Sequence, residues 1–202
     1  MKHVEMKPKR CDWCGNDPLY VKYHDEEWGR LVEDDRKMFE FLVLESAQAG
    51  LSWITILRKR ENYRKAFAKF DAKKVAKFDD ADVERLMNNP GIIRNRLKIN
   101  AAISNARYFL AIQKEFGSFC TYLRTFLPKG QPVVNRWKTI DEIPPRTELS
   151  DTISKDMKRR GFKFFGSTIC YAHLQATGFV NDHLLDCPAR RETKKQFNFS
   201  RK

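Results

Sequence analysis

The stretch from Leu44 to Trp53 constrains the fold most, because an apolar helix carrying one carboxylate ends there at Gly50 and a second helix begins. Over residues 35–49 apolar side chains recur at helical spacing. Glu45 falls on the same stripe, which contains Met38, Phe41, Leu42, Gln48 and Ala49. We therefore expect Glu45 to face the interior, where a carboxylate needs a partner from the protein or from a ligand.

The residues alone leave two roles open for Glu45. In a structural role, its carboxylate accepts hydrogen bonds from backbone N–H groups near Gly50 or pairs with an arginine. Structural ion pairs are common, so composition favours this role. In a functional role, a bound ligand supplies the partner.

The composition limits the classes of protein to which the chain can belong. Its 202 residues suffice for one large domain or two small lobes. Lys and Arg number 39 against 26 Asp and Glu, which favours a polyanionic partner such as nucleic acid, although a merely basic soluble protein would show the same surplus. No apolar run resembles a membrane span or signal core, so we expect a cytoplasmic protein without membrane association.

Helical periodicity, caps and breakers predict a nearly all-α chain. We expect a flexible basic segment at residues 1–10, a single domain of two helical lobes over residues 11–190, and a flexible basic tail at residues 191–202. Residues 11–29 are predicted to form a mostly irregular aromatic arm, and residues 128–145 an extended loop. The expected helices span residues 35–49, 53–70, 73–77, 81–88, 94–115, 118–127, 149–160 and 168–177, with a last helix holding His183 and Cys187.

The cysteines and histidines suggest a metal site. Five cysteines are an odd number, which argues against a secreted disulfide framework. His183 and Cys187 are four apart on a predicted helix and would project from one face. Cys11 and His24 could complete a Cys2His2 zinc site that joins the first and last structured segments. Cys14 offers an alternative, because it forms a Cys-x2-Cys pair with Cys11 that could supply both sulfurs or a disulfide.

Two further groups of residues suit DNA. The turn at Gly91 is followed by a helix start, which predicts outward-facing backbone N–H groups beside Arg94, Arg96 and Lys98, as a phosphate requires. Any junction between two helices can look like this. The aromatic residues near the Glu45 segment in sequence would suit a base lifted from a duplex, although such clusters are more often plain core; they are Trp13, Tyr20, Tyr23, Trp28 and Trp53.

Taken together, these residues resemble the 3-methyladenine DNA glycosylase I family of the helix-hairpin-helix superfamily. The resemblance covers almost all of residues 11–187. It rests on these motifs: Asp17-Pro18-Leu19-Tyr20, Tyr23-His24-Asp25, Glu27-Trp28-Gly29, Leu44-Glu45, Gln48-Ala49-Gly50-Leu51-Ser52-Trp53-Ile54, Lys59-Arg60-Glu61-Asn62-Tyr63, Gly91-Ile92-Ile93-Arg94, Arg160-Gly161-Phe162-Lys163-Phe164, Thr168-Ile169-Cys170-Tyr171 and Val180-Asn181-Asp182-His183.

The resemblance implies a role for each candidate residue. It implies a helix-hairpin-helix glycosylase fold whose ends are clasped by a structural zinc on Cys11, His24, His183 and Cys187. The lesion base would lie among Trp13, Tyr23, Trp28 and Trp53 and hydrogen-bond to Glu45, which becomes the candidate catalytic residue. Leu51, beside Gly50, would wedge into the gap left by the flipped nucleotide. The DNA contacts implied are Gly50, Leu51, Gly91, Ile92, Arg94 and Arg96.

The resemblance also implies a reaction: a monomeric, monofunctional enzyme of base-excision repair would release 3-methyladenine from alkylated double-stranded DNA by hydrolysis. Most relatives in the superfamily carry a catalytic aspartate on the helix after the hairpin, yet residues 106–111 contain no carboxylate. N3 alkylation makes the purine cationic and weakens its glycosidic bond, so less catalysis is needed. Glu45 would read this cation or act as a general base.

Two other classes of protein are alternatives. A zinc-dependent hydrolase is disfavoured, because four protein ligands leave no open position for water. A basic, zinc-stabilised DNA-binding protein without activity would release no base from alkylated DNA.

Overall fold

The computed structural model describes residues 9–190 of the chain. The predicted flexible segments at residues 1–10 and 191–202 lie outside the described residues, apart from residues 9 and 10. The helices and the two short strands are α1 (Pro18–Glu26), α2 (Asp35–Gln48), α3 (Trp53–Ala66), α4 (Ala72–Val75), α5 (Asp80–Met87), α6 (Arg96–Phe116), α7 (Phe119–Arg124), β1 (Val133–Val134), α8 (Glu148–Arg159), α9 (Ser167–Ala176) and β2 (Val180–Asn181), with 3-10 turns at Asp12–Cys14, Ala68–Phe70, Pro128–Gly130 and Ile140–Glu142.

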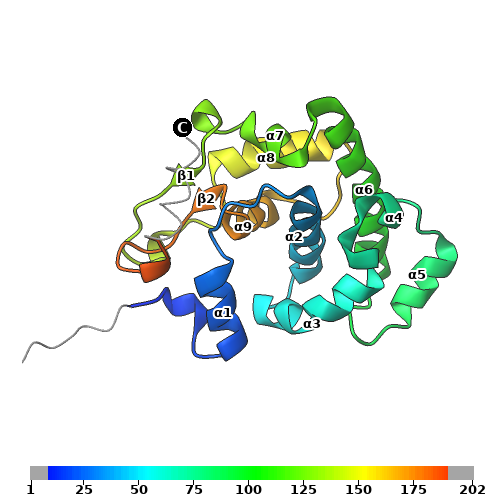
Figure 1. The fold of residues 1–202 in the computed structure, drawn as a ribbon, viewed down its shortest axis with the longest axis horizontal. Coiled ribbons are helices and arrows are strands. Elements are labelled where there is room, and N and C mark those ends of the chain that lie inside the picture. Colours follow the sequence, from blue (N-terminus) through cyan, green and yellow to red (C-terminus); the bar gives the residue numbers. More distant parts are fainter. Residues whose placement is uncertain (1–8, 191–202) are drawn as a thin grey trace, which may run out of the picture.

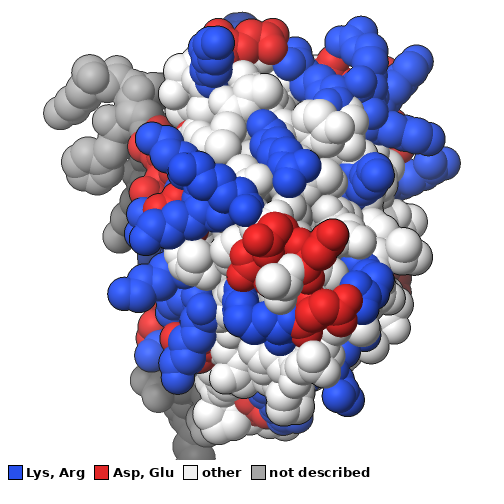
Figure 2. All heavy atoms as spheres, turned by 90° about the vertical axis from the view of Figure 1, so that its right-hand side faces the viewer, with Lys and Arg blue, Asp and Glu red and all other residues white. Residues whose placement is uncertain are grey.

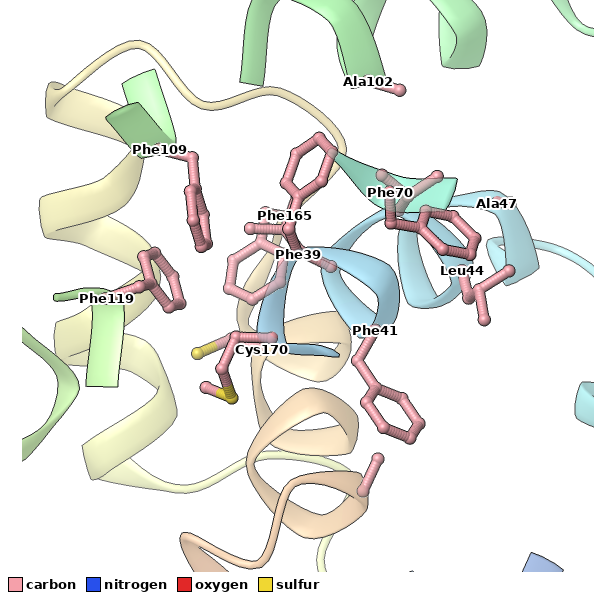
Figure 3. Close-up of a cluster of buried hydrophobic side chains, with 14 of the residues drawn as sticks. Phe39, Phe41, Leu44, Ala47, Phe70, Ala102, Phe109, Phe119, Phe165 and Cys170 are labelled. Carbon is pink, nitrogen blue, oxygen red and sulfur yellow. The ribbon is translucent and has the colours of Figure 1, made fainter. Parts of the chain in front are cut away.

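Helix α2 lies at the centre of the molecule, with α3, α6, α7 and α9 packed around it (Figure 1). Every residue from Met38 to Ala47 is buried, so the helix has no solvent-facing side over these positions. Phe39 lies 5.3 Å from Phe109 of α6, and Phe109 stacks 4.5 Å from Phe119 of α7 (Figure 3). The predicted inward stripe is confirmed but incomplete, because a helix surrounded by other helices is buried on all sides.

The aromatic arm predicted at residues 11–29 is wrong in its main feature. Asp17 and Pro18 start a regular helix there: the Asp17 carboxylate accepts hydrogen bonds from the backbone N–H groups of Leu19 and Tyr20 at 2.9 and 3.3 Å, and Pro18 occupies the first turn. An acidic cap followed by proline is a helix start. Helix α1 holds Tyr20, Tyr23 and His24 at fixed positions.

The helix predicted to carry His183 and Cys187 is also wrong. Residues 182–187 form a loop and turn after β2. Strand β2 pairs in parallel with β1, Val133 opposite Val180 and Val134 opposite Asn181, which ties the 128–145 segment to the C-terminal part of the chain. Elsewhere α3 ends at Ala66, before residue 70, because residues 68–70 take left-handed φ values of 51–56°.

The structure is nearly all α-helical, as predicted, and residues 11–14 lie beside the loop of residues 182–187 (Figure 1). None of the helices within residues 9–190 combines the length and apolar character needed to cross a membrane.

Candidate functional site

A pocket of about 380 Å³ opens between α1, α2, α9 and the start of α3. All five residues predicted to hold a base line it. Two further wall residues are Tyr20 of α1 and Gln48 of α2, and the rest come from α9 and residues 140–145. The complete lining is Trp13, Tyr20, Tyr23, Trp28, Glu45, Gln48, Trp53, Ile140, Ile143, Pro144, Pro145, Thr168, Tyr171, Ala172 and Gln175.

The rings of the pocket pack against one another at angles that leave their faces and edges both presented. Trp13 lies 4.9 Å from Trp28 and 5.2 Å from Tyr20, measured between ring centroids. Tyr23 lies 5.4 Å from Trp53 with the planes tilted by 46°. Such rings provide apolar contact for a flat ligand and electron-rich faces for a cation.

Glu45 is the one carboxylate among the lining residues, and it is 2% exposed. Its Oε2 atom is buried without a hydrogen-bond partner among residues 9–190. Burial raises the pKa of Glu45 to about 8, because the charged form loses its hydration. The indole N–H of Trp53 is also buried and unpartnered in the described part of the chain. Unsatisfied polar atoms in a pocket indicate that a ligand supplies their partners.

The structural role considered for Glu45 has no support in the surrounding contacts. The buried arginine of α3, Arg60, bonds to Glu40 at 2.7 Å and to Glu27 at 2.9 Å. The turn at Gly50 is held differently, because the amine of Lys98 donates to the carbonyls of Ala47 and Ala49 at 2.8 and 2.6 Å. Lys98, predicted to add charge for a phosphate, instead caps the end of α2.

Behind the aromatic wall lies a buried group of four residues that could hold a metal ion: Cys11, His24, His183 and Cys187. Their ligand atoms all lie within 4.8 Å of one another. The Cys187 sulfur is 3.5 Å from His24 Nε2 and 3.5 Å from His183 Nδ1. A tetrahedral zinc with ligands at ~2.0–2.3 Å separates ligand atoms by roughly 3.5 Å. The donor set and its spacing therefore fit such an ion.

The contacts around this group orient its ligands. His183 Nε2 donates to the carbonyl of Trp28 at 2.9 Å, which leaves Nδ1 to face the sulfurs. His24 Nδ1 bonds to Asp25 at 2.8 Å, which leaves Nε2 to do the same. A hydrogen bond from the Cys11 thiol, together with those from His183 and His24, lowers the pKa of the Cys187 thiol although burial opposes this. Histidines held in this way are typical of metal centres.

Cys14 lies outside the group. Its thiol is directed at the carbonyl of Cys11, 3.1 Å away. All five cysteines are free thiols.

The turn between α5 and α6 differs from the prediction in one respect. Its backbone N–H groups at Gly91, Ile92 and Ile93 donate within the protein, to Asn89 Oδ1, to the Asn89 carbonyl and to the Tyr63 hydroxyl. The N–H groups without an acceptor in the described part of the chain are that of Arg94, just before α6, and those of Arg96 and Leu97 in its first turn. A phosphate would thus meet the helix start, not the tight turn.

The residues predicted to contact DNA differ in how far they are exposed. Ile92 is 3% exposed, so its side chain belongs to the core. Gly91 packs so closely that a Cβ there would lie 2.9 Å from the Asn62 side chain. Arg94 is exposed, and Arg96 is exposed but bonds to Glu84 at 2.7 Å.

Gly50 and Leu51 form an exposed turn between Gln48 and Trp53, two residues that line the pocket. Gly50 has a left-handed φ of 81°, and Leu51 is 41% exposed. An exposed leucine at this place is available to insert between bases.

Both positive and negative side chains lie on the face that carries α5. Figure 2 shows the face on the α5 side, where Lys and Arg surround a central acidic group. Helix α5 supplies Asp80, Asp82 and Glu84 on this side. The positive charge on this face is therefore interrupted by a group of carboxylates.

Sequence reasoning missed the wall formed by α9 and residues 140–145. Tyr171 belongs to a motif of the resemblance, but nothing in the spacing assigns it to a pocket. Gln175 and Pro144 reach the pocket only through tertiary packing.

The geometry can be compared with known proteins. A family model for methyladenine glycosylase matches residues 13–191. DNA-3-methyladenine glycosylase 1 of Escherichia coli (strain K12) is 51% identical over 179 residues, 89% of this chain and 95% of that protein. A crystal structure of 3-methyladenine DNA glycosylase I is 52% identical, with a TM-score of 0.86 over 89% of this chain and 98% of that one. A variant of 3-methyladenine DNA glycosylase I in complex with 3-methyladenine is 37% identical, with a TM-score of 0.86 over 89% and 96% of the two chains.

Proposed function

This chain belongs to the methyladenine glycosylase family, and on that premise we propose that it releases 3-methyladenine from alkylated DNA in base-excision repair. It is a hydrolase of the N-glycosidic bond. The observation that carries the proposal is Glu45, a buried carboxylate in a pocket of aromatic rings whose Oε2 atom has no partner among the described residues. A cationic purine supplies the partner of this carboxylate.

The chemistry follows from the charge of the substrate. In DNA, N3 methylation makes adenine a cation, and its departure as a neutral base needs little acid catalysis. Trp13, Trp28 and Trp53 offer electron-rich faces to this cation. A cation beside Glu45 favours the ionised carboxylate, which then offers a negative charge in a site of low dielectric. Undamaged adenine is neutral and gains neither interaction to the same extent. Removing the base from the stack costs a few kcal/mol, which these contacts offset.

Water attacks the sugar as the base leaves, so the enzyme is monofunctional. Glu45 either stabilises the cation alone or also accepts the proton of that water. If it is the general base, activity rises with pH toward its pKa of about 8. A rate that is flat from about pH 6 to 8 would count against the general-base role.

A zinc ion fits the clasp of Cys11, His24, His183 and Cys187. When bound, it supplies structural stability and no activated water, because four protein ligands fill a tetrahedral shell. The clasp joins the segment before α1 to the loop after β2. Trp13 and Trp28 lie directly against it, with Trp28 4.6 Å from the His183 ring.

The protein contacts the duplex at two places, the turn at Leu51 and the start of α6. Leu51 fills the gap in the stack, while the first N–H groups of α6, with Arg94 and Arg96, hold a phosphate. Lys98 links these two parts by holding the end of α2. The protein acts as a monomer, inside the cell, on double-stranded DNA.

The test is chromatographic detection of free 3-methyladenine after methylated duplex DNA is incubated with the zinc-loaded protein. The chain should release the base, and Glu45→Gln should release it far more slowly. Equal release by both proteins would keep the activity and remove Glu45 from its role. No release by the folded parent chain would leave a basic, zinc-stabilised DNA-binding protein as the better account.

A further inference from the structure

A second carboxylate, Asp182, lies fully buried between the pocket wall and the clasp. It directly follows β2, and its backbone neighbour His183 faces the metal group. The carboxylate itself takes no place among the four residues of that group. The reaction described above does not use it.

Four neutral donors converge on the Asp182 carboxylate. Asn135 Nδ2 and Trp137 Nε1 each donate to Oδ1 at 2.7 Å. Gln175 Nε2 donates to Oδ2 at 2.7 Å, and the Tyr171 hydroxyl donates to the same oxygen. A carboxylate only accepts hydrogen bonds, so its presence fixes the direction of every one of these bonds.

These donors belong to two walls of the pocket. Tyr171 and Gln175 line it from α9. Asn135 and Trp137 lie in the segment that leads from β1 to the Ile140–Glu142 turn, and Ile140, Ile143 and Pro144 form the second wall. One side chain therefore ties both walls together, helped by a bond from the Leu185 N–H to the Trp137 carbonyl at 2.9 Å.

The same bonds set the polarity of the α9 wall. Tyr171 has one O–H proton and gives it to Asp182, so its oxygen can only accept from anything inside the pocket. Gln175 must turn its NH2 group toward Asp182, because the reverse orientation would oppose two acceptors. A base that brings N–H donors or a positive charge suits this wall, and a base that brings only acceptors does not.

We propose that Asp182 is a positioning and specificity-determining residue: it anchors the 140–145 wall and holds Tyr171 and Gln175 so that they accept hydrogen bonds from the base. The inference rests on the proposed function for the identity of the base. It adds a second source of selection for an electron-poor purine, separate from Glu45.

The first test is the affinity of Asp182→Asn for free 3-methyladenine, measured by calorimetry or by NMR titration. The asparagine amide would face donors, so Tyr171 and Gln175 lose their fixed orientation. We expect binding of 3-methyladenine to weaken about tenfold, while binding of undamaged duplex changes less than about twofold because its phosphate contacts lie elsewhere. Equal weakening for both ligands, or for neither, would overturn the proposal.

Asp35→Asn is the matched control. Asp35 also holds donors from separate elements, bonding to Gln113 at 2.7 Å and to the backbone N–H of Phe119 at 3.0 Å, but it lies outside the pocket lining. This variant should lose stability and keep its affinity for 3-methyladenine. If it loses base affinity as Asp182→Asn does, both effects are general loosening and the proposal fails.

A double-mutant cycle with Tyr171→Phe tests the route of the effect, and Tyr171→Phe carries the test alone if Asp182→Asn does not fold. Tyr171→Phe should weaken base binding severalfold. If Asp182 acts through Tyr171, the double variant loses less than the product of the two single effects. Independent effects, or no effect of Tyr171→Phe, would refute it. A parent chain that binds the free base but releases none from DNA would refute the proposed activity and leave this binding test intact.

Discussion

Two carboxylates at opposite ends of α2 have opposite surroundings. Asp35, in the first turn, is bonded by Gln113 of α6 and by two backbone N–H groups at the start of α7. Glu45, near the last turn, is more deeply buried and has no partner for Oε2 among residues 9–190. The same helix thus carries one acid that is bonded to two other helices and one whose Oε2 atom faces the pocket without a partner in the described part of the chain. Saturation by internal donors distinguishes the two roles better than burial does.

Removing the metal should have the largest effect on stability, because the four buried residues of the clasp would lose the ion that they share. Chelation of the zinc-loaded protein is expected to lower the free energy of unfolding by more than about 4 kcal/mol, since metal binding is coupled to folding. Denaturant titrations with and without chelator measure this. Cys14→Ser, which alters a cysteine outside the group, should unfold like the parent; if it loses zinc, the assignment of the sulfur ligands is wrong.

Glu45→Gln tests the role of the pocket carboxylate. We expect kcat/KM for 3-methyladenine release to fall about 100-fold, as the negative charge that favours the cation is lost. The variant should remain folded, because no internal bond to Oε2 is broken. Single-turnover kinetics on methylated duplex give the effect, and a loss below threefold would contradict the role.

Asp35→Asn tests the role of the carboxylate that is bonded within the protein. Its amide would place a donor against other donors, so stability should fall by about 1–3 kcal/mol. Base release at 25 °C should stay within about twofold of the parent. Thermal unfolding followed by circular dichroism, together with the release assay, checks both. An active-site defect in this variant would mean that the two ends of α2 are coupled.

The pH dependence of stability sharpens the contrast most gradually, because its effect is spread over several pH units. Glu45 has a folded pKa of about 8 against an ordinary 4.5, so the folded state binds the extra proton between these values. Stability of the parent should therefore fall as pH rises through this range, by up to about 1.4 kcal/mol per pH unit from this group. Glu45→Gln should lack that slope. Identical slopes in urea titrations at several pH values would show that Glu45 ionises freely.

The sequence predicted the helical class, the inward position of Glu45 and the four clustered Cys and His residues. These depend on local periodicity, or on residue types and motifs that the resemblance connects. It missed α1 because a nine-residue aromatic helix shows little period, although Asp17-Pro18 marks its start. It assigned His183 and Cys187 to a helix because a spacing of four suits one, whereas a turn can bring the same atoms together.

Other features depend on long-range contacts that no local pattern contains. The N–H groups of Gly91 and Ile93 are taken by Asn89 and by Tyr63 of α3, so the turn is closed to a phosphate. Lys98 reaches the end of α2 instead of the solvent. The second wall of the pocket depends on how residues 140–145 are anchored, which only the folded chain reveals.

The hydrogen bond from His183 to the Trp28 carbonyl has a consequence for protein engineering. The Trp28 ring lines the pocket and also lies 4.6 Å from the His183 ring, so a redesign for a different lesion has little freedom at this position. Trp13 is constrained in the same way, 5.2 Å from the His24 ring. The more variable positions belong to the wall formed by residues 140–145, where Ile140 is 37% exposed. Ile143 packs against the cluster that contains Cys11 and Cys187 and should be kept. Libraries that vary Ile140, Pro144 and Pro145 are therefore expected to change which base is accepted while preserving the group of Cys11, His24, His183 and Cys187.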